Sequence, residues 1–237
     1  MIIIKNFSKR YNGSDRYAVK DLNLEIHGGE VFGFIGHNGA GKSTTIKSVV
    51  GALDFEEGEI LIAGNSIAKN PLKAKEVMAY VPDNPDIYEF LTGIQYLNFV
   101  CDVFGIGEDE RQERIEKYAE TFQLKGHLGD LISSYSHGMK QKLVLISALV
   151  HNPKLLILDE PFVGLDPIAS YRLKEIMRQL CDSGTAIFFS THVLEVAEKL
   201  CDRVGIIKAG KLVKEGTMQE IAGDKSLESL FLEIADE

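Results

Sequence analysis

The sequence has few cysteines, and their arrangement does not suggest a structural role. Cys101, Cys181 and Cys201 are far apart, odd in number and without the short spacings of a metal site. A disulfide framework is therefore not expected, and the composition fits a reducing compartment such as the cytosol. We interpret the three thiols as ordinary core or surface side chains.

Long hydrophobic runs are also missing. The mainly apolar stretch Leu143 to Val150, interrupted by Ser147, is far shorter than the roughly 20 residues that a membrane-spanning helix needs. Met1 leads directly into three isoleucines, without the basic start and small-residue cleavage site of a secretory signal. The sequence thus predicts a soluble cytoplasmic protein whose role at a membrane, if it has one, depends on a partner.

Positive charge is in deficit. The chain has 26 Lys and Arg residues against 35 Asp and Glu, a formal net charge of −9. That balance argues against a broad nucleic-acid-binding surface, and no nucleic-acid partner is expected. Apolar residues make up 45% of the 237 residues and charged residues 26%, which is ordinary for a soluble chain with a sizeable core.

One glycine-rich stretch dominates what is present. Residues 36–43 read Gly-His-Asn-Gly-Ala-Gly-Lys-Ser and fit the phosphate-binding P-loop, between an apolar run of strand length and a predicted helix. Its glycines let backbone N–H groups curl inward, Lys42 supplies charge for the β- and γ-phosphates, and Ser43 offers a hydroxyl to Mg²⁺. The predicted nucleotide site contains Gly36, His37, Asn38, Gly39, Ala40, Gly41, Lys42, Ser43 and Thr44.

The strand and helix patterns predict an α/β fold in one domain, 1–237. Residues 1–30 and part of 55–65 predict an N-terminal antiparallel β subdomain, and about 86–150 a mainly helical insert. The remainder alternates strands with helices, as in a P-loop NTPase core with a mainly parallel sheet. A short helical tail is predicted over 217–237, beginning with the capping box Thr217-x-x-Glu220.

A second motif is an apolar strand, 155–158, that ends in Asp159 and Glu160. Ligands in open α/β sheets lie at the carboxyl ends of strands, so both acids are expected near the P-loop. One can hold Mg²⁺ while the other orients or deprotonates an attacking water. Two acids alone would more often be a solvated strand end, but together with a P-loop they favour catalysis.

Residues 136–141, Ser-His-Gly-Met-Lys-Gln, open a further predicted helix. Here the sequence resembles the ATP-binding subunits of ABC transporters, whose signature usually reads L-S-G-G-Q. The resemblance covers nearly the whole chain. Its landmarks occur in family order: the P-loop, this signature, Asp159-Glu160, the loop Gly164-Leu165-Asp166-Pro167, and the histidine of Ser190-Thr191-His192.

The resemblance implies a role for each landmark. Asp159 would hold Mg²⁺, Glu160 would be the general base, and His192 would touch the γ-phosphate, with Lys42 completing the catalytic set. The cofactors would be ATP and Mg²⁺, and the reaction would be ATP hydrolysis.

The resemblance also implies that one chain has only half of its site. Ser136 and Gly138 would close on ATP held by a second ATPase subunit, either an identical copy or a close relative, and Asp166 would contact that subunit. Tyr11 matches the aromatic residue that stacks on adenine, and Tyr17 is its rival; either could instead be a strand-face aromatic.

Three departures from the family pattern affect the site. His137 replaces the first signature glycine and Met139 the glutamine, while the two residues that would touch phosphate are kept. Asp83 occupies a slot that the family fills with glutamine. A carboxylate is a good Mg²⁺ ligand, so we predict that Asp83 belongs to the metal site, although Pro82-Asp83-Asn84-Pro85 also has ordinary turn chemistry.

Residues 86–91, Asp-Ile-Tyr-Glu-Phe-Leu, have four large apolar side chains where a surface connection is expected. In the family this region borders the groove that receives a helix of the membrane subunit. Tyr88 and Phe90 are therefore docking candidates, whereas Ile87 and Leu91 could equally pack inside the insert.

The resemblance as a whole implies an ATPase subunit, peripheral on the cytoplasmic face of a membrane, that drives an integral membrane permease through ATP-dependent dimer closure. The signature form and short tail look more like exporter-type subunits. One alternative is a soluble ABC-type ATPase with a non-transport role, but such proteins usually have two cassettes or a long coiled-coil insertion. Another is a GTPase or small-molecule kinase, but the guanine-specifying Asn-Lys-x-Asp is absent.

Overall fold

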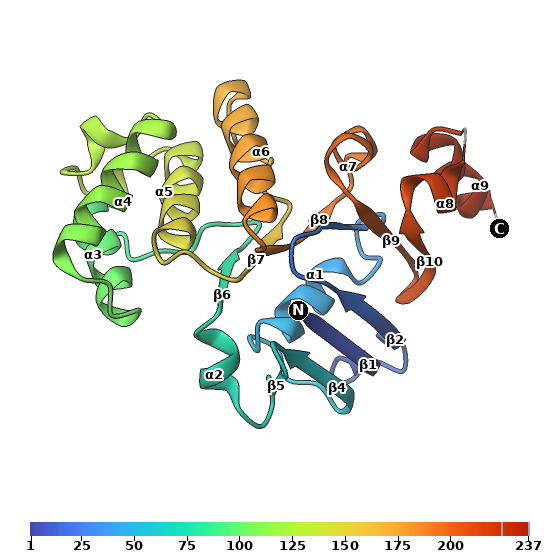
Figure 1. Cartoon of the computed structure of the whole chain (residues 1–237). Coiled ribbons are helices and arrows are strands. Elements are labelled where there is room, and N and C mark those ends of the chain that lie inside the picture. Colours follow the sequence, from blue (N-terminus) through green and yellow to red (C-terminus); the bar gives the residue numbers. More distant parts are fainter. Residues whose placement is uncertain (224, 237) are drawn as a thin grey trace.

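The strands form two sheets (Figure 1). The computed structural model describes residues 1–223 and 225–236. The smaller sheet is antiparallel, in the order β2-β1-β4-β5, with β1 (Ile2–Arg10), β2 (Tyr17–Ile26), β4 (Glu57–Ile62) and β5 (Asn65–Ser66). The larger sheet has the order β10-β9-β3-β8-β7-β6, with β3 (Val31–Ile35), β6 (Met78–Val81), β7 (Leu155–Asp159), β8 (Ala186–Thr191), β9 (Arg203–Lys208) and β10 (Lys211–Thr217). All its strand pairs are parallel except β9 with β10.

The helices cover the larger sheet and build a lobe at one end of the molecule. That lobe, green to yellow in Figure 1, contains α3 (Gly93–Val103), α4 (Glu108–Thr121), α5 (His137–Val150) and two short 3₁₀ helices, Lys125–His127 and Ile132–Ser134. The other helices are α1 (Lys42–Val49), α2 (Pro71–Lys75), α6 (Pro167–Asp182), α7 (Leu194–Leu200), α8 (Met218–Ala222) and α9 (Leu227–Asp236). The predicted fold class is confirmed.

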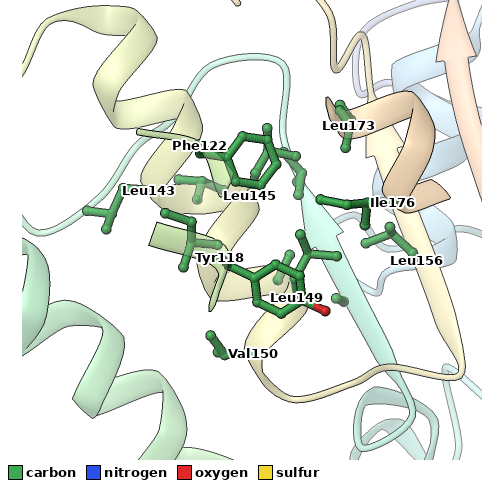
Figure 2. Packing of buried hydrophobic residues seen from close by; sticks show 14 of the residues in the cluster. Tyr118, Phe122, Leu143, Leu145, Leu149, Val150, Leu156, Leu173 and Ile176 are labelled. Carbon is green, nitrogen blue, oxygen red and sulfur yellow. The ribbon is translucent and has the colours of Figure 1, made fainter. Parts of the chain in front are cut away.

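Alternation along β7 explains how the larger sheet is covered on both faces. Leu156 and Leu158 belong to a core cluster shared with α5 and α6, whereas Leu155 and Ile157 pack in a second cluster with the small sheet and α1. Figure 2 shows the first cluster, where Tyr118 of α4 meets side chains from α5, β7 and α6. The helical lobe therefore shares one continuous core with the sheet that carries the P-loop.

Side-chain caps fix where several functional helices begin. Thr92 and Gln95 form a capping box at α3, and Thr217 and Glu220 form the predicted one at α8. Asp166 caps α6 through a hydrogen bond that its Oδ1 accepts from the Ala169 N–H at 2.9 Å. These helices thus begin at defined, polar turns.

Some details differ from the prediction. The helix after the P-loop begins at Lys42, inside the motif itself, the two-residue strand β5 follows β4, and the tail contains two helices, α8 and α9. Leu227, Leu230 and Ile234 of α9 pack with Ile35 and Ile206, and this burial stabilises the second tail helix.

The three cysteines are free thiols. Within 1–223 and 225–236, no helix combines the length and apolar character that crossing a bilayer requires.

Candidate nucleotide-binding site

Four strands of the larger sheet end at the same edge, and each is followed by a predicted site residue. The P-loop follows β3, Glu160 follows β7, His192 follows β8, and Asp83 follows β6. A cavity of about 370 Å³ opens there, lined by Tyr11, Ala18, His37, Asn38, Gly39, Gly41, Lys42, Ser43, Thr44, Asp83 and Glu160. Most of the residues predicted from the sequence therefore surround one cavity.

Glycine is required at the P-loop for two different reasons. Gly41 has φ 114°, and a β-carbon there would lie 2.7 Å from the Ala18 carbonyl oxygen. A β-carbon on Gly36 would lie 2.5 Å from the Ile207 carbonyl oxygen, which is too close for any side chain. The turn delivers the chain into α1 without a side-chain cap, so the first N–H groups of this helix are available to an anion.

Lys42 lies inside the loop that precedes it. Its Nζ donates to the Gly36 carbonyl oxygen at 2.6 Å and stands 3.4 Å from Glu160 Oε1. The side chain is only 6% exposed, so its charge acts in a weakly screened environment. It is positioned to attract phosphate, as the P-loop pattern predicts.

Ser190 holds the two adjacent acids apart. Its hydroxyl donates to Asp159 Oδ1 at 2.5 Å and accepts from the Glu160 N–H at 3.0 Å. Asp159 is fully buried, and this burial raises the pKa of its carboxyl, opposed by hydrogen bonds from Ser190 and Ser43. Sequence reasoning missed Ser190 as an individual site residue. Its place one position before the Thr191-His192 pair at a strand end is the signal that could have identified it.

Glu160 points into the cavity from a strained backbone. Its φ of 49° is unusual for a residue other than glycine, and such strain is often found at functional sites. Glu160 Oε2 lies 3.0 Å from Nδ1 of His192, which is exposed. The predicted base and the predicted phosphate sensor are therefore in direct contact.

The oxygen atoms at the base of the cavity suit a hard cation. Asp159 Oδ2 is buried without a hydrogen-bond partner, and the nearby Ser43 hydroxyl lowers the pKa of the same carboxyl against the larger effect of burial. Within the described ranges no group of three or more His, Cys, Asp and Glu residues could hold a metal alone. That fits Mg²⁺, which typically takes one or two protein oxygens and completes its shell with water and phosphate.

Asp83 faces the cavity and also takes part in a turn. It lines the cavity together with Ser43 and Glu160, and its Oδ1 accepts from the Asn84 N–H at 2.9 Å, which is turn chemistry. Its negative charge raises the pKa of Asp159, so the two carboxylates are close enough to interact.

Tyr11, rather than Tyr17, lies over the P-loop. The Tyr11 hydroxyl is 3.1 Å from Thr44 Oγ1, and its ring is 46% exposed at the cavity. Tyr17 bonds to Glu57 instead, and its ring lies beneath Arg10 and Lys20. The geometry therefore favours Tyr11 as the platform for a base.

Ser136, Gly138 and Asp166 form a separate group, outside the residues that line the cavity. Asp166 Oδ2 pairs with Lys142 Nζ of α5 at 2.6 Å, and a β-carbon on Gly138 would lie 2.9 Å from the Gly164 carbonyl oxygen. His137 is exposed beside Gly164, where only a glycine leaves room for its ring.

The C-terminal helix also reaches the P-loop. The ring of Phe231 on α9 lies 4.6 Å from that of His37, between centroids. The group of Ser136, Gly138 and Asp166, which we call the signature group, therefore lies apart from the cavity. The helix α9 lies against the P-loop.

Comparison with known proteins agrees with this geometry. A family model described as ABC transporter matches residues 19–163. The chain belongs to the ABC transporter family. Within that family it is an ATP-binding domain, and ATP hydrolysis is the activity that membership implies.

Two curated relatives come from Bacillus subtilis (strain 168). The uncharacterized ABC transporter ATP-binding protein YhcH is 40% identical over 89% of this chain and 68% of its own length. The ABC-type transporter ATP-binding protein EcsA is 33% identical over 93% of this chain and 91% of its own. A solved ATP-binding subunit of an ABC transporter superposes with a TM-score of 0.94, at 34% identity and 99% coverage of both chains.

Proposed function

We propose that this chain is the ATP-hydrolysing subunit of a membrane transporter, acting as a single ATPase domain on the cytoplasmic face through a separate permease. The observation that carries the proposal is the contact of Lys42 and His192 with Glu160 beside the P-loop cavity. A base held between a phosphate-binding lysine and an exposed histidine is arranged to act on a terminal phosphate.

The residues divide the work by position. The P-loop backbone and Lys42 would bind the phosphates, Tyr11 would stack on adenine, and Glu160 would take a proton from water. Ser43 and Asp159, with Asp83 beside them, would hold Mg²⁺, which supplies neutralisation of phosphate charge. His192 would register the γ-phosphate through its bond to Glu160.

The separate signature group supports a dimer as part of this proposal. Ser136, His137 and Asp166 are exposed and lie outside the cavity of their own chain. A serine hydroxyl and free N–H groups at the start of α5 suit phosphate, so a second subunit would place them on its neighbour's ATP. Closure of this pair on ATP would be the step that moves the permease.

An exposed surface beside α5, the helix that begins with the signature segment and that we call the signature helix, supports the proposal of a membrane partner. Tyr88, Phe90 and Phe99, which we call the aromatic patch, are 51%, 76% and 47% exposed and touch one another through Tyr88. Ile87 and Leu91 instead pack against the core. Glu89, between Tyr88 and Phe90, pairs with Lys140 of α5, so a helix docked on the patch would act directly on the signature helix.

The proposed direction of transport is outward. It depends on the form of the Tyr-Ser-His-Gly-Met-Lys-Gln segment, which resembles exporter-type subunits.

The Glu160→Gln variant tests the proposal. Without its base it should bind MgATP, stop hydrolysing and accumulate as a dimer, because the closed state no longer decays. The measurements are size-exclusion chromatography with MgATP and turnover of ATP against GTP. Glu113→Gln, an exposed change on α4, is the control and should behave as wild type.

The partner is tested with the same variant. A tagged Glu160→Gln chain, isolated from detergent-solubilised membranes of the source cell, should retain a stoichiometric multi-span protein detectable by mass spectrometry. Only soluble partners, with the bait folded and binding ATP, would indicate a soluble ABC-type ATPase. A strictly monomeric variant under MgATP would contradict the dimer.

A further inference from the structure

Tyr80 on β6 has a buried hydroxyl whose partner is not among the described residues. Its ring packs in the core cluster between the larger sheet and α1, while the hydroxyl oxygen is buried and makes no hydrogen bond. A phenol has an ordinary pKa of about 10, so this group carries its proton at neutral pH and can act as a donor.

The strand register places this donor beside Asp159. Tyr80 stands directly opposite Ile157 on β7, and Asp159 lies two residues further along on the same face, because side chains alternate. Neighbouring strands lie about 4.8 Å apart and rise about 3.3 Å per residue, so diagonal neighbours of this kind are roughly 8 Å apart at the backbone, within reach of a tyrosine side chain.

Asp159 Oδ2 can accept a hydrogen bond and still bind a cation, because each carboxylate oxygen has two lone pairs. Asp159 Oδ1 accepts from Ser190, whereas Oδ2 is buried without a partner. A buried donor without an acceptor and a buried acceptor without a donor are each costly, and here the two lie on the same face of neighbouring strands.

We propose that Tyr80 is a positioning residue of the metal site: its hydroxyl donates, directly or through one water, to Asp159 and holds that carboxylate in the orientation that receives the cation. This inference rests on the proposed function, because it takes the cavity to be a MgATP site. Groups that orient a metal ligand typically change metal affinity about 10–100-fold when removed.

The test is Tyr80→Phe, which removes one oxygen and keeps the ring. Binding of a fluorescent ATP analogue is titrated once with Mg²⁺ and once with EDTA. We expect affinity at least about tenfold weaker with Mg²⁺ and unchanged with EDTA. Tyr118→Phe, the same change in the helical lobe, is the control and should match wild type in both titrations.

Each other result has a distinct meaning. A wild-type response to Mg²⁺ in Tyr80→Phe would overturn the inference while leaving the proposed function intact. Equal weakening with Mg²⁺ and with EDTA would assign Tyr80 to packing and overturn it too. A wild-type chain that binds no nucleotide would remove the proposed function and this inference together.

Discussion

At the residue scale, the side chains of the adjacent acids Asp159 and Glu160 point in different directions because of the backbone conformation at Glu160 and the hydrogen bonds of one hydroxyl. Asp159 ends a strand and stays buried, while the left-handed backbone at Glu160 turns the next side chain toward His192. Ser190 bonds to both residues and fixes that divergence. One acid can therefore serve a metal and the other a water molecule, although they are consecutive in the sequence.

Asp83 should contribute more to catalysis than to ATP binding. Replacing it by alanine removes an oxygen beside the predicted metal ligands, whereas the P-loop backbone and Lys42 still hold the phosphates. We expect Asp83→Ala to slow hydrolysis by about tenfold or more with ATP affinity little changed, because it acts near the metal site. Asp83→Gln restores an oxygen and should stay active.

Steady-state ATPase assays and nucleotide titrations on the same preparations measure both effects. Asp86→Ala, another exposed aspartate of the same connection, serves as the control. Unaltered turnover in Asp83→Ala would refute the metal-site role and leave only turn chemistry.

The sequence motifs predicted the residues that line or border the site, but not the residues that hold them in place. The P-loop, Asp159, Glu160 and His192 were predicted because their chemistry is encoded in local patterns. Ser190 and Tyr80 lie near Asp159 because of how their strands pair with β7, and no local sequence pattern predicts that pairing. Their roles needed the pairing of β6, β7 and β8.

At the element scale, the ends of α3 and α5 are joined by a stacked pair of rings. His151 follows α5 and lies against Phe104, which follows α3, with centroids 3.8 Å apart and planes 1° from parallel. Burial, together with the nearby charge of Arg114, lowers the pKa of His151 from 6.5 to about 4. The folded chain therefore holds this imidazole neutral.

Because His151 stays neutral in the folded chain, the free energy of unfolding should fall in mild acid. The unfolded chain takes up a proton on His151 as pH falls below 6.5, but the folded chain does not until about 4. The stabilisation is therefore present above pH 6.5 and lost as pH falls through that window, amounting to about 1 kcal/mol between pH 7.5 and 5.5.

Urea unfolding at those two pH values measures the effect. His151→Phe keeps an apolar ring against Phe104, so its free energy of unfolding should fall less on acidification, by about 1 kcal/mol. Replacing the exposed His27 with asparagine is the control. Identical pH dependence in His151→Phe and wild type would contradict the prediction.

Elements with strong local signals were predicted well, and those made by tertiary contact were not. The capping box at Thr217 is confirmed. The helix α9 owes its place to packing against β3 and β9, which its own sequence does not reveal.

At the scale of the whole molecule, the helical lobe links an exposed surface to the nucleotide edge of the sheet. Its core cluster includes residues of β6 and β7, among them Leu156 in Figure 2. Asp83 and Glu160, which follow these two strands, line the cavity. The order of the sheet, with β7 between β6 and β8, brings Asp83, Glu160 and His192 together, and sequence patterns alone do not establish that order.

The aromatic patch should decide whether the chain associates with its membrane partner. Tyr88 and Phe90 are exposed, so changing both to serine removes apolar contact area without opening a cavity in the core. We expect the double variant to fold, bind ATP as wild type does, and fail to co-purify with the permease. The control changes the exposed apolar residues Leu72 and Val213 to serine, far from the patch in sequence.

Co-purification from solubilised membranes and ATP titration of the isolated chain, performed on both variants, separate docking from stability. If the Tyr88 and Phe90 variant unfolds, the two rings belong to the core and the patch is not a docking surface. If it folds and still retains the permease, docking occurs elsewhere, and the pairing of Glu89 with Lys140 serves only to fasten the connection to α5. If it folds and loses the permease, the same ion pair becomes the shortest physical link between membrane subunit and signature helix.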